Sequence, residues 1–140
     1  MNHRIAILSD IHGDTTALKA VIADARALGA TEYWLLGDIL LPGPGREDLF
    51  ELLDAIPITA AVRGNWDDCV LEALDGEYGL EDPQEIQLLR LTQYLMEGLD
   101  PKRIDWLRSL PLVEKKEVNG IRFSLTHNLP EKNYGGDLRP

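Results

Sequence analysis

Apolar and polar positions in the first half of the chain follow two alternating patterns. The run at 4–8 is short, β-branched and free of internal polar residues, which is typical of a strand buried on both faces, and similar strands are predicted at 32–36 and 59–62. Between them, apolar residues recur at spacings of three and four, which indicates amphipathic helices over 15–28 and about 47–55. Strands and helices in alternation predict a parallel sheet with right-handed crossovers.

The pattern changes to acidic, helix-forming segments in the second half of the chain. Helices are predicted over about 67–74, 83–96 and 101–109, and we interpret 67–109 as a helical insert or cap. We expect this insert to belong to a single domain that covers 1–140, because a chain of 140 residues is the size of one ordinary domain.

A hairpin is predicted after the helices. Two strands, at about 112–118 and 121–126, are separated by Asn119-Gly120. Asn-Gly is the favoured pair for a two-residue type I′ turn, in which both central residues have positive φ. The chain therefore combines a parallel sheet with an antiparallel pair of strands.

Charge and composition narrow the classes of function. The chain carries 14 Lys plus Arg against 24 Asp plus Glu, a formal net charge of −10, which disfavours nucleic acid and anionic lipid as partners. No apolar run reaches the roughly 18 residues of a membrane span, and no signal-peptide pattern is present, so we expect a cytoplasmic protein without a membrane partner. The single cysteine, Cys69, excludes an internal disulfide and a thiolate metal site, and we interpret it as a small core residue.

Polar residues gather where the predicted strands end. Asp10 and His12 follow the first strand, Asp38 the second, Asn65 the third, and His127 the last. The carboxyl ends of parallel strands are where open α/β sheets bind ligands. Carboxylate, imidazole and amide donors together suit Mn²⁺, Fe or Zn²⁺, and a carboxylate such as Asp38 can bridge two cations that hold a hydroxide and clamp a phosphate.

Each of these residues also has a structural interpretation. Asp10 and His12 could belong to a loop that caps a helix, Asn65 could occupy a left-handed turn after Gly64, and His127 could be a satisfied histidine at a strand end. An α/β nucleotide-binding module without metal is disfavoured, because the turn after the first strand lacks Gly-x-Gly-x-x-Gly and a phosphate-loop lysine.

The order and spacing of Asp10-Ile11-His12, Gly37-Asp38, Gly64-Asn65 and His127 resemble the calcineurin-like metallophosphoesterase superfamily. The resemblance implies an α/β fold, a βαβα sandwich of mixed sheets, and two divalent metal ions (Mn, Fe, Ni or Zn) that hydrolyse phosphate esters or anhydrides through a metal-bound hydroxide. Position by position it implies Asp10 and His12 as ligands of the first metal, Asp38 as the bridge, and Asn65 and His127 as ligands of the second.

Finer similarities suggest a branch of this family. The segments Gly37-Asp38-Ile39, Gly64-Asn65-Trp66 and 127–135 resemble the small bacterial phosphodiesterases, including those that split diadenosine tetraphosphate symmetrically. The resemblance implies a phosphorylated small molecule or nucleotide as the partner and diadenosine tetraphosphate as a possible substrate.

Two departures from the family pattern bear on activity. Trp66 stands where most members carry a histidine that protonates the leaving group, and no Gly-His-x-His segment follows His127. We therefore expect a domain that lacks its C-terminal strands, is poorly active, and associates into homo-oligomers through the hairpin edge around 121–125. The alternative function is that of an impaired relative that keeps a partial metal site and acts only by binding.

Further polar and aromatic residues near the motifs are candidates for substrate contact. Arg63 could meet a phosphate and Trp66 could stack on a base, although an ion pair and packing are the simpler roles. Asp67 and Asp68 are interpreted as the N-cap and first-turn acids of the next helix. The remaining candidates for contact with a nucleotide are Lys132, Asn133 and Tyr134, which could equally form a mobile tail.

Overall fold

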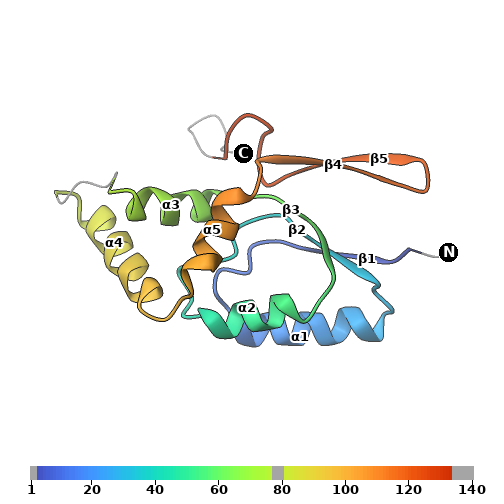
Figure 1. Cartoon of the computed structure of the whole chain (residues 1–140), viewed down its shortest axis with the longest axis horizontal. Coiled ribbons are helices and arrows are strands. Elements are labelled where there is room, and N and C mark those ends of the chain that lie inside the picture. Colours follow the sequence, from blue (N-terminus) through green and yellow to red (C-terminus); the bar gives the residue numbers. More distant parts are fainter. Residues whose placement is uncertain (1–2, 77–80, 134–140) are drawn as a thin grey trace.

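A computed structural model describes residues 3–76 and 81–133 and shows a mixed α/β architecture (Figure 1). Three parallel strands form one sheet in the order β1 (Ile5–Leu8), β2 (Glu32–Leu35) and β3 (Ile58–Ala61). The connecting helices α1 (Thr15–Ala27) and α2 (Glu47–Asp54) lie together on one side of this sheet. The predicted parallel sheet with helical crossovers is therefore confirmed, and so is the capping of α1, since the Asp14 side chain accepts from the Ala17 amide at 2.8 Å.

A β-hairpin lies on the opposite side of the sheet from α1 and α2 (Figure 1). It consists of β4 (Val113–Val118) and β5 (Ile121–Thr126), which pair antiparallel over their whole length. The turn residues Asn119 and Gly120 have φ of 51° and 78°, as a type I′ turn requires. The predicted hairpin is confirmed.

Strand β2 lies between two apolar layers. Tyr33 and Leu35 face the helices and belong to the main core, whereas Trp34 faces the hairpin and contacts Phe123 edge to face at a centroid distance of 5.3 Å. All three β2 side chains are about 1% exposed. This two-sided burial explains the uninterrupted apolar run in the sequence, because successive strand residues point to opposite faces.

Strand β1 differs from the prediction of burial on both faces. Leu8 is buried against the helices, but Ile7, on the other face, is 55% exposed. Ile7 pairs in register with Trp34, which packs against the hairpin. Ile5, on the same face of β1, packs against the cluster that holds Trp34 and Leu125, whereas Ile7 stays exposed. An apolar run in the sequence cannot distinguish a central strand from an edge strand covered on one face only.

Three helices occupy the predicted insert: α3 (Asn65–Leu74), α4 (Pro83–Met96) and α5 (Pro101–Ser109). Their side chains Val70, Leu95 and Leu107 are buried in the same cluster as Leu8 and Leu18, so the insert shares the main core. Cys69 is half-buried rather than a fully buried core residue. None of the helices in the described part of the chain has the length and apolarity needed to cross a membrane. A role of 67–109 as a substrate cap stays a prediction.

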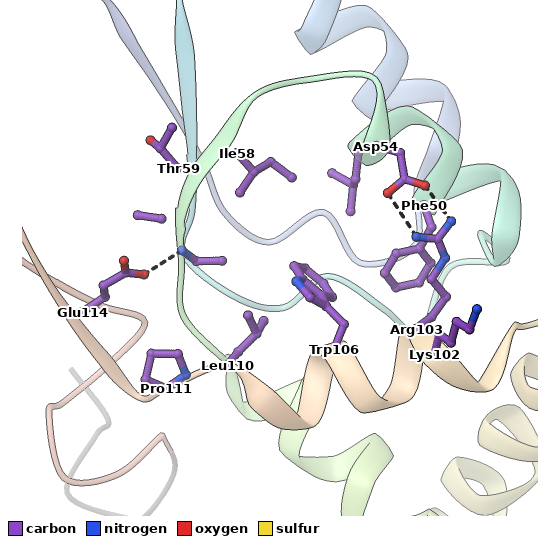
Figure 2. Close-up of a pocket in the computed structure, with 13 residues that line it drawn as sticks. Phe50, Asp54, Ile58, Thr59, Lys102, Arg103, Trp106, Leu110, Pro111 and Glu114 are labelled. Carbon is purple, nitrogen blue, oxygen red and sulfur yellow. Dashed lines mark hydrogen bonds and ion pairs between the residues drawn. The ribbon is translucent and has the colours of Figure 1, made fainter.

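Arg103 joins α5 to α2. Its guanidinium donates to Glu47 at 2.7 and 2.9 Å and to Asp54 at 2.7 and 3.0 Å, and it lies over the Phe50 ring; Figure 2 shows the pair with Asp54. This fork raises the pKa of Arg103, chiefly through the hydrogen bond to Asp54. The geometry requires a planar donor that a lysine cannot supply.

We expect Arg103→Lys to lower the free energy of unfolding by about 1 kcal/mol, because a lysine keeps the charge and loses the fork. Urea denaturation monitored by circular dichroism measures this change. Arg108→Lys is the matched control, since Arg108 pairs with Asp75 at an exposed position and should cost less. Equal losses in the two variants would contradict the prediction.

Candidate metal centre

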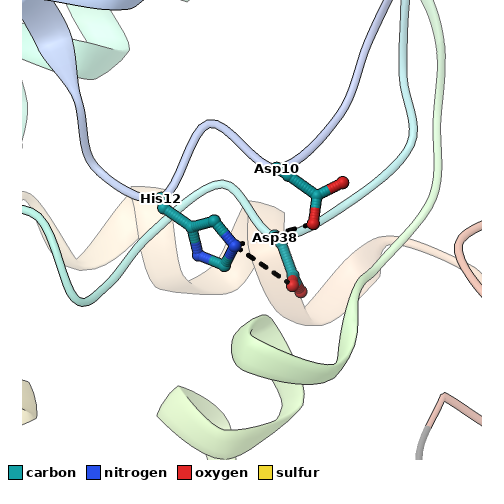
Figure 3. Close-up of side chains that lie close together, drawn as sticks. All are labelled: Asp10, His12 and Asp38. Atoms are coloured by element: carbon teal, nitrogen blue, oxygen red, sulfur yellow. Dashed lines mark ion pairs between the residues drawn. The ribbon is translucent and has the colours of Figure 1, made fainter. Parts of the chain in front are cut away.

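The predicted ligands Asp10, His12 and Asp38 lie together at the carboxyl edge of the sheet (Figure 3). Asp10 and His12 come from the turn after β1, and Asp38 from the loop after β2. One ligand atom from each residue falls within 4.8 Å of the others. The His12 Nε2 atom is 3.6 Å from Asp10 Oδ1 and 3.6 Å from Asp38 Oδ2. This is a compact cluster of one imidazole and two carboxylates.

All three residues have a left-handed backbone conformation. The φ angles are 57° at Asp10, 51° at His12 and 55° at Asp38, a region that non-glycine residues occupy at a cost of order 1–3 kcal/mol. Backbone hydrogen bonds between the two loops hold these angles, since the His12 amide donates to the Asp38 carbonyl at 2.9 Å. Strain of this kind gathers at functional sites, where it directs side chains toward a common point.

The His12 ring is oriented by a backbone carbonyl. Its Nδ1 lies 2.7 Å from the Leu41 carbonyl oxygen, which can only accept, so Nδ1 carries the proton. In the neutral ring Nε2 then presents its lone pair toward Asp10 and Asp38. Anchoring of the far nitrogen is the usual arrangement of a metal-ligating histidine.

His127 repeats this arrangement on the other side of Asp38. Its Nδ1 donates to the Leu36 carbonyl at 2.6 Å, and its Nε2 lies 3.0 Å from Asn65 Oδ1 and 3.4 Å from Asp38 Oδ2. The hydrogen bond to Asp38 raises the pKa of His127 to about 9, although partial burial opposes this shift. With Nδ1 protonated, a neutral His127 ring would direct the Nε2 lone pair at Asn65 Oδ1 and Asp38 Oδ2. A proton or a metal ion bound to Nε2 would remove this repulsion.

Asp38 is the central carboxylate among the five predicted ligands. Asp38 Oδ2 lies between the two imidazoles, 3.6 Å from His12 Nε2 and 3.4 Å from His127 Nε2. Asp38 is 3% exposed at its side chain, whereas Asp10 is 55% exposed and opens the cluster to solvent. Nitrogen and oxygen donors in this mixture suit Mn²⁺, Fe, Ni²⁺ or Zn²⁺.

Asn65 is the first residue of α3, so the left-handed turn considered as its alternative does not occur. Helix α3 begins two residues earlier than predicted, because Gly64, not Asp67, is its N-cap. The extended Gly64 allows the helix to start directly at the sheet edge, which places Asn65 against His127.

Asp67 has a function that its sequence position did not reveal. It is fully buried, and its carboxylate accepts from the amides of Asp38 at 2.8 Å, Gly64 at 2.9 Å and Ile39 at 2.9 Å. Burial raises the pKa of Asp67 to about 6 against the opposing effect of these donors. The expectation that Asp67 is the N-cap is wrong: Asp67 lies in the first turn of α3, as Asp68 does, and its main role is to join the Asp38 loop to the Gly64 turn. An acid three residues after the N-cap, as in a capping box, was the available signal.

Two glycines, Gly37 and Gly64, allow the loop that carries Asp38 to contact the turn before α3. A Cβ on Gly37, whose φ is 87°, would lie 2.4 Å from the Gly64 amide nitrogen, and a Cβ on Gly64 would lie 2.1 Å from Asp38 Oδ1. Neither position has room for a side chain. The close contact brings the Asp38 carboxylate onto the first turn of α3, where the Trp66 amide donates to it at 2.9 Å.

Arg63 and Trp66 have structural partners. The Arg63 guanidinium pairs with Asp68 and donates to the Leu110 carbonyl at 2.9 Å, which ties α3 to the end of α5. The Trp66 ring contacts the His12 ring edge to face at 5.8 Å. The ion-pair and packing alternatives describe these contacts, and substrate binding by either residue stays a prediction.

The segment after His127 is attached to the same cluster. The Asn133 amide donates to the Arg63 carbonyl at 2.8 Å and to Asp68 at 2.9 Å, and Asn133 is 2% exposed. Asn133 is therefore part of the packed structure rather than a tail. Lys132 also belongs to the described residues, whereas Tyr134 lies outside them, and a nucleotide contact by this segment stays a prediction.

Together, the parallel sheet, the hairpin and the cluster of Asp10, His12 and Asp38 define a class: mixed α/β proteins with a candidate metal site at the carboxyl edge of the parallel sheet. The sequence profile described as calcineurin-like phosphoesterase matches residues 3–138. The chain belongs to this family, as the motifs suggested.

The relatives that match the chain are longer than it is. It is 30% identical over 131 residues to the uncharacterized protein MJ0912 of Methanocaldococcus jannaschii, covering 91% of this chain and 50% of that protein. A metallophosphoesterase structure from Sphaerobacter thermophilus is similar with a TM-score of 0.59 and 31% identity, over 81% of this chain and 44% of the other. The chain thus spans about half the length of the curated relative it matches.

The hypothetical protein PH1004 from Pyrococcus horikoshii OT3 has the same fold. The TM-score is 0.71 at 22% identity, over 94% of this chain and 57% of the other. The two structural similarities together confirm the mixed α/β fold class.

Proposed function

We propose that this protein is a divalent-metal-dependent phosphoesterase that hydrolyses a phosphate ester or anhydride. Asp10 and His12 would hold one cation, Asn65 and His127 the other, and Asp38 both. The observation that carries the proposal is the position of Asp38 Oδ2 between the Nε2 atoms of the two imidazoles, at 3.6 and 3.4 Å. Family membership supports metal-dependent phosphoester hydrolysis as the chemistry.

Bound divalent cations supply Lewis-acid polarisation of a phosphoryl group and lower the pKa of water. The residues of the chain provide the geometry for this chemistry. The Leu41 and Leu36 carbonyls fix the two imidazole rings, Asp67 fixes the loop that carries Asp38, and the exposed Asp10 leaves one side of the cluster open to substrate. Trp66 cannot transfer a proton at neutral pH, so it gives no general acid to the leaving group.

A more specific proposal concerns the substrate, the cellular location and the partners of the protein. The likeness of 37–39, 64–66 and 127–135 to small bacterial phosphodiesterases supports a phosphorylated small molecule or nucleotide, with diadenosine tetraphosphate as the specific candidate, and a cytoplasmic location. The acidic charge of −10 supports the absence of nucleic-acid partners. Association through the hairpin stays a prediction, and the exposed Ile121 and Phe123 on β5 support it.

The test combines metal binding with turnover. The chain, freed of metal with a chelator, is titrated with MnCl₂ by calorimetry, and then incubated with bis(p-nitrophenyl) phosphate and with diadenosine tetraphosphate. We expect two equivalents of Mn²⁺ to bind and hydrolysis to require them. Absence of saturable Mn²⁺ binding would contradict the metal centre itself.

The second candidate is a relative that binds metal and phosphorylated ligands without efficient turnover. Trp66 at the position of the usual proton donor favours this function. The same experiment separates the two: Mn²⁺ and diadenosine tetraphosphate would bind, but neither phosphodiester would be hydrolysed above the rate of the Asp38→Asn variant.

A further inference from the structure

Asn133 is a buried polar residue that the proposed metal centre does not use as a ligand. It lies in the segment that follows β5 and is 2% exposed. Its Nδ2 group donates to the Arg63 carbonyl at 2.8 Å and to Asp68 Oδ2 at 2.9 Å. A carbonyl and a carboxylate both accept, which fixes the orientation of the amide. In the part of the chain that the structure describes, Oδ1 is buried without a hydrogen-bond partner, so the two Nδ2 bonds are what hold this side chain.

Asp68 connects this amide to the first turn of α3. Its Oδ2 accepts from Asn133, and its Oδ1 pairs with the Arg63 guanidinium. Arg63 directly precedes Gly64, the N-cap of α3, and Asp68 lies in the first turn of the helix. Asn133 therefore binds the chain on both sides of Asn65.

The segment between His127 and Asn133 forms a compact loop. The amides and carbonyls of Leu129 and Lys132 pair reciprocally at 3.2 and 3.4 Å, and the Asn128 side chain donates to the Asn133 carbonyl. These bonds shorten the path between the two ends of the loop. Fixing the Asn133 end therefore restricts the His127 end.

We propose that Asn133 is a positioning residue that holds the His127 loop against the Asn65 turn and thereby sets one half of the metal centre. This inference rests on the proposed function, in which Asn65 and His127 bind the second cation. Their side chains are 3.0 Å apart, and the bonds of Asn133 join the two segments that carry them. Among the described residues, no hydrogen bond joins Asn133 to the turn of Asp10 and His12, so only the second half-site depends on it.

Asn133→Asp tests this role, because it keeps the shape of the side chain and replaces the donor with an oxygen. That oxygen would face the Arg63 carbonyl and the Asp68 carboxylate. Asn119→Asp is the matched control: it adds the same charge at an exposed turn position, where Asp-Gly is also favoured. Asn133→Ala removes the same bonds without burying a charge, and it replaces Asn133→Asp if that variant does not fold.

NMR of the histidine rings resolves the two half-sites, because the chain has three histidines. His12 reports the first half-site, His127 reports the second, and His3 is an internal reference. The chain, freed of metal with a chelator, is titrated with ZnCl₂. We expect His127 in Asn133→Asp to need about ten-fold more zinc than in the control, the low end of the loss caused by changes behind a metal ligand, and His12 to saturate as in the control. Equal weakening at both rings, the result of a general loss of structure, or no change at His127 would overturn the proposal.

A second measurement, without metal, separates this proposal from the proposed function. The Nδ1 groups of His12 and His127 donate to backbone carbonyls. In either Asn133 variant the Nδ1 proton of His127 should exchange with solvent faster than in the wild type, and that of His12 at the wild-type rate. An unchanged His127 rate would overturn the proposal. Failure of the wild-type chain to bind zinc would overturn the metal centre, and the exchange rates would still show whether Asn133 positions His127.

Discussion

Replacing Asp38 with asparagine should strongly weaken the binding of both proposed cations. The buried Asp38 carboxylate faces the His12 and His127 rings through one oxygen, while its other oxygen accepts from the Trp66 amide at 2.9 Å. An asparagine oxygen can keep the bond to Trp66, which directs the new NH₂ group at the two imidazoles. The variant therefore keeps the shape of the site and replaces the shared ligand with a donor that cannot bind metal.

We expect the affinity for Mn²⁺ to fall by more than about 100-fold, since loss of a second-shell partner alone costs 10–100-fold in such sites. Calorimetric titration measures the change, and circular dichroism confirms that the variant is folded. Asp24→Asn, an exposed substitution on α1, is the matched control and should bind as the wild type does. Binding by Asp38→Asn within three-fold of the control would rule out Asp38 as the shared ligand.

The largest expected effect on stability comes from Asp67→Asn. The Asp67 carboxylate accepts from four backbone amides on two loops, and no donor is needed at this position. In asparagine one oxygen becomes an NH₂ group that faces N–H donors, which leaves at least one buried amide without an acceptor. We expect the free energy of unfolding to fall by about 3 kcal/mol.

Urea denaturation measures this loss, again with Asp24→Asn as the control. The mechanism also predicts where the damage appears: the amides of Asp38, Ile39 and Gly64 should exchange with solvent faster than those of β2, because their acceptor is gone. A loss below about 0.5 kcal/mol, the size of an ordinary surface substitution, would show that the buried carboxylate does not hold the loops.

Local sequence patterns predicted most of the elements. Helix α1 has its apolar spacing, its Asp14 cap and its terminal Gly29 within one short segment, and the Asn119-Gly120 turn determines its own hairpin. Such features depend on neighbouring residues, so they can be recognised without the fold. The exposure of Ile7 depends on how far the hairpin extends across the sheet, which no local pattern contains.

The metal centre could be predicted in part. The order of Asp10, His12, Asp38 and Asn65 at the ends of the predicted parallel strands brings these four residues to one edge of that sheet. His127 follows the separate hairpin, so its place beside them depends on how the hairpin packs on the sheet. The left-handed conformations at Asp10, His12 and Asp38 depend on hydrogen bonds between loops far apart in sequence, and these could not be inferred.

The role of Asp67 is another feature that the sequence alone could not predict. An acid in the first turn of a helix is usually explained by the helix dipole, and that explanation was sufficient for the sequence. Its actual partners on Asp38 and Ile39 are 28 or 29 positions away, so its importance depends on tertiary structure.

The first turn of α3 carries both Asn65 and Asp67, which has a mechanical consequence. The Asn65 side chain contacts His127, and the Asp67 carboxylate accepts hydrogen bonds from the loop that carries Asp38. A shift of α3 would therefore displace both contacts in the same direction. Helix α3 also packs with α4 and α5. A displacement of the helical insert would therefore move Asp38 and Asn65 together, which preserves the distance between these two proposed ligands while the helices adjust.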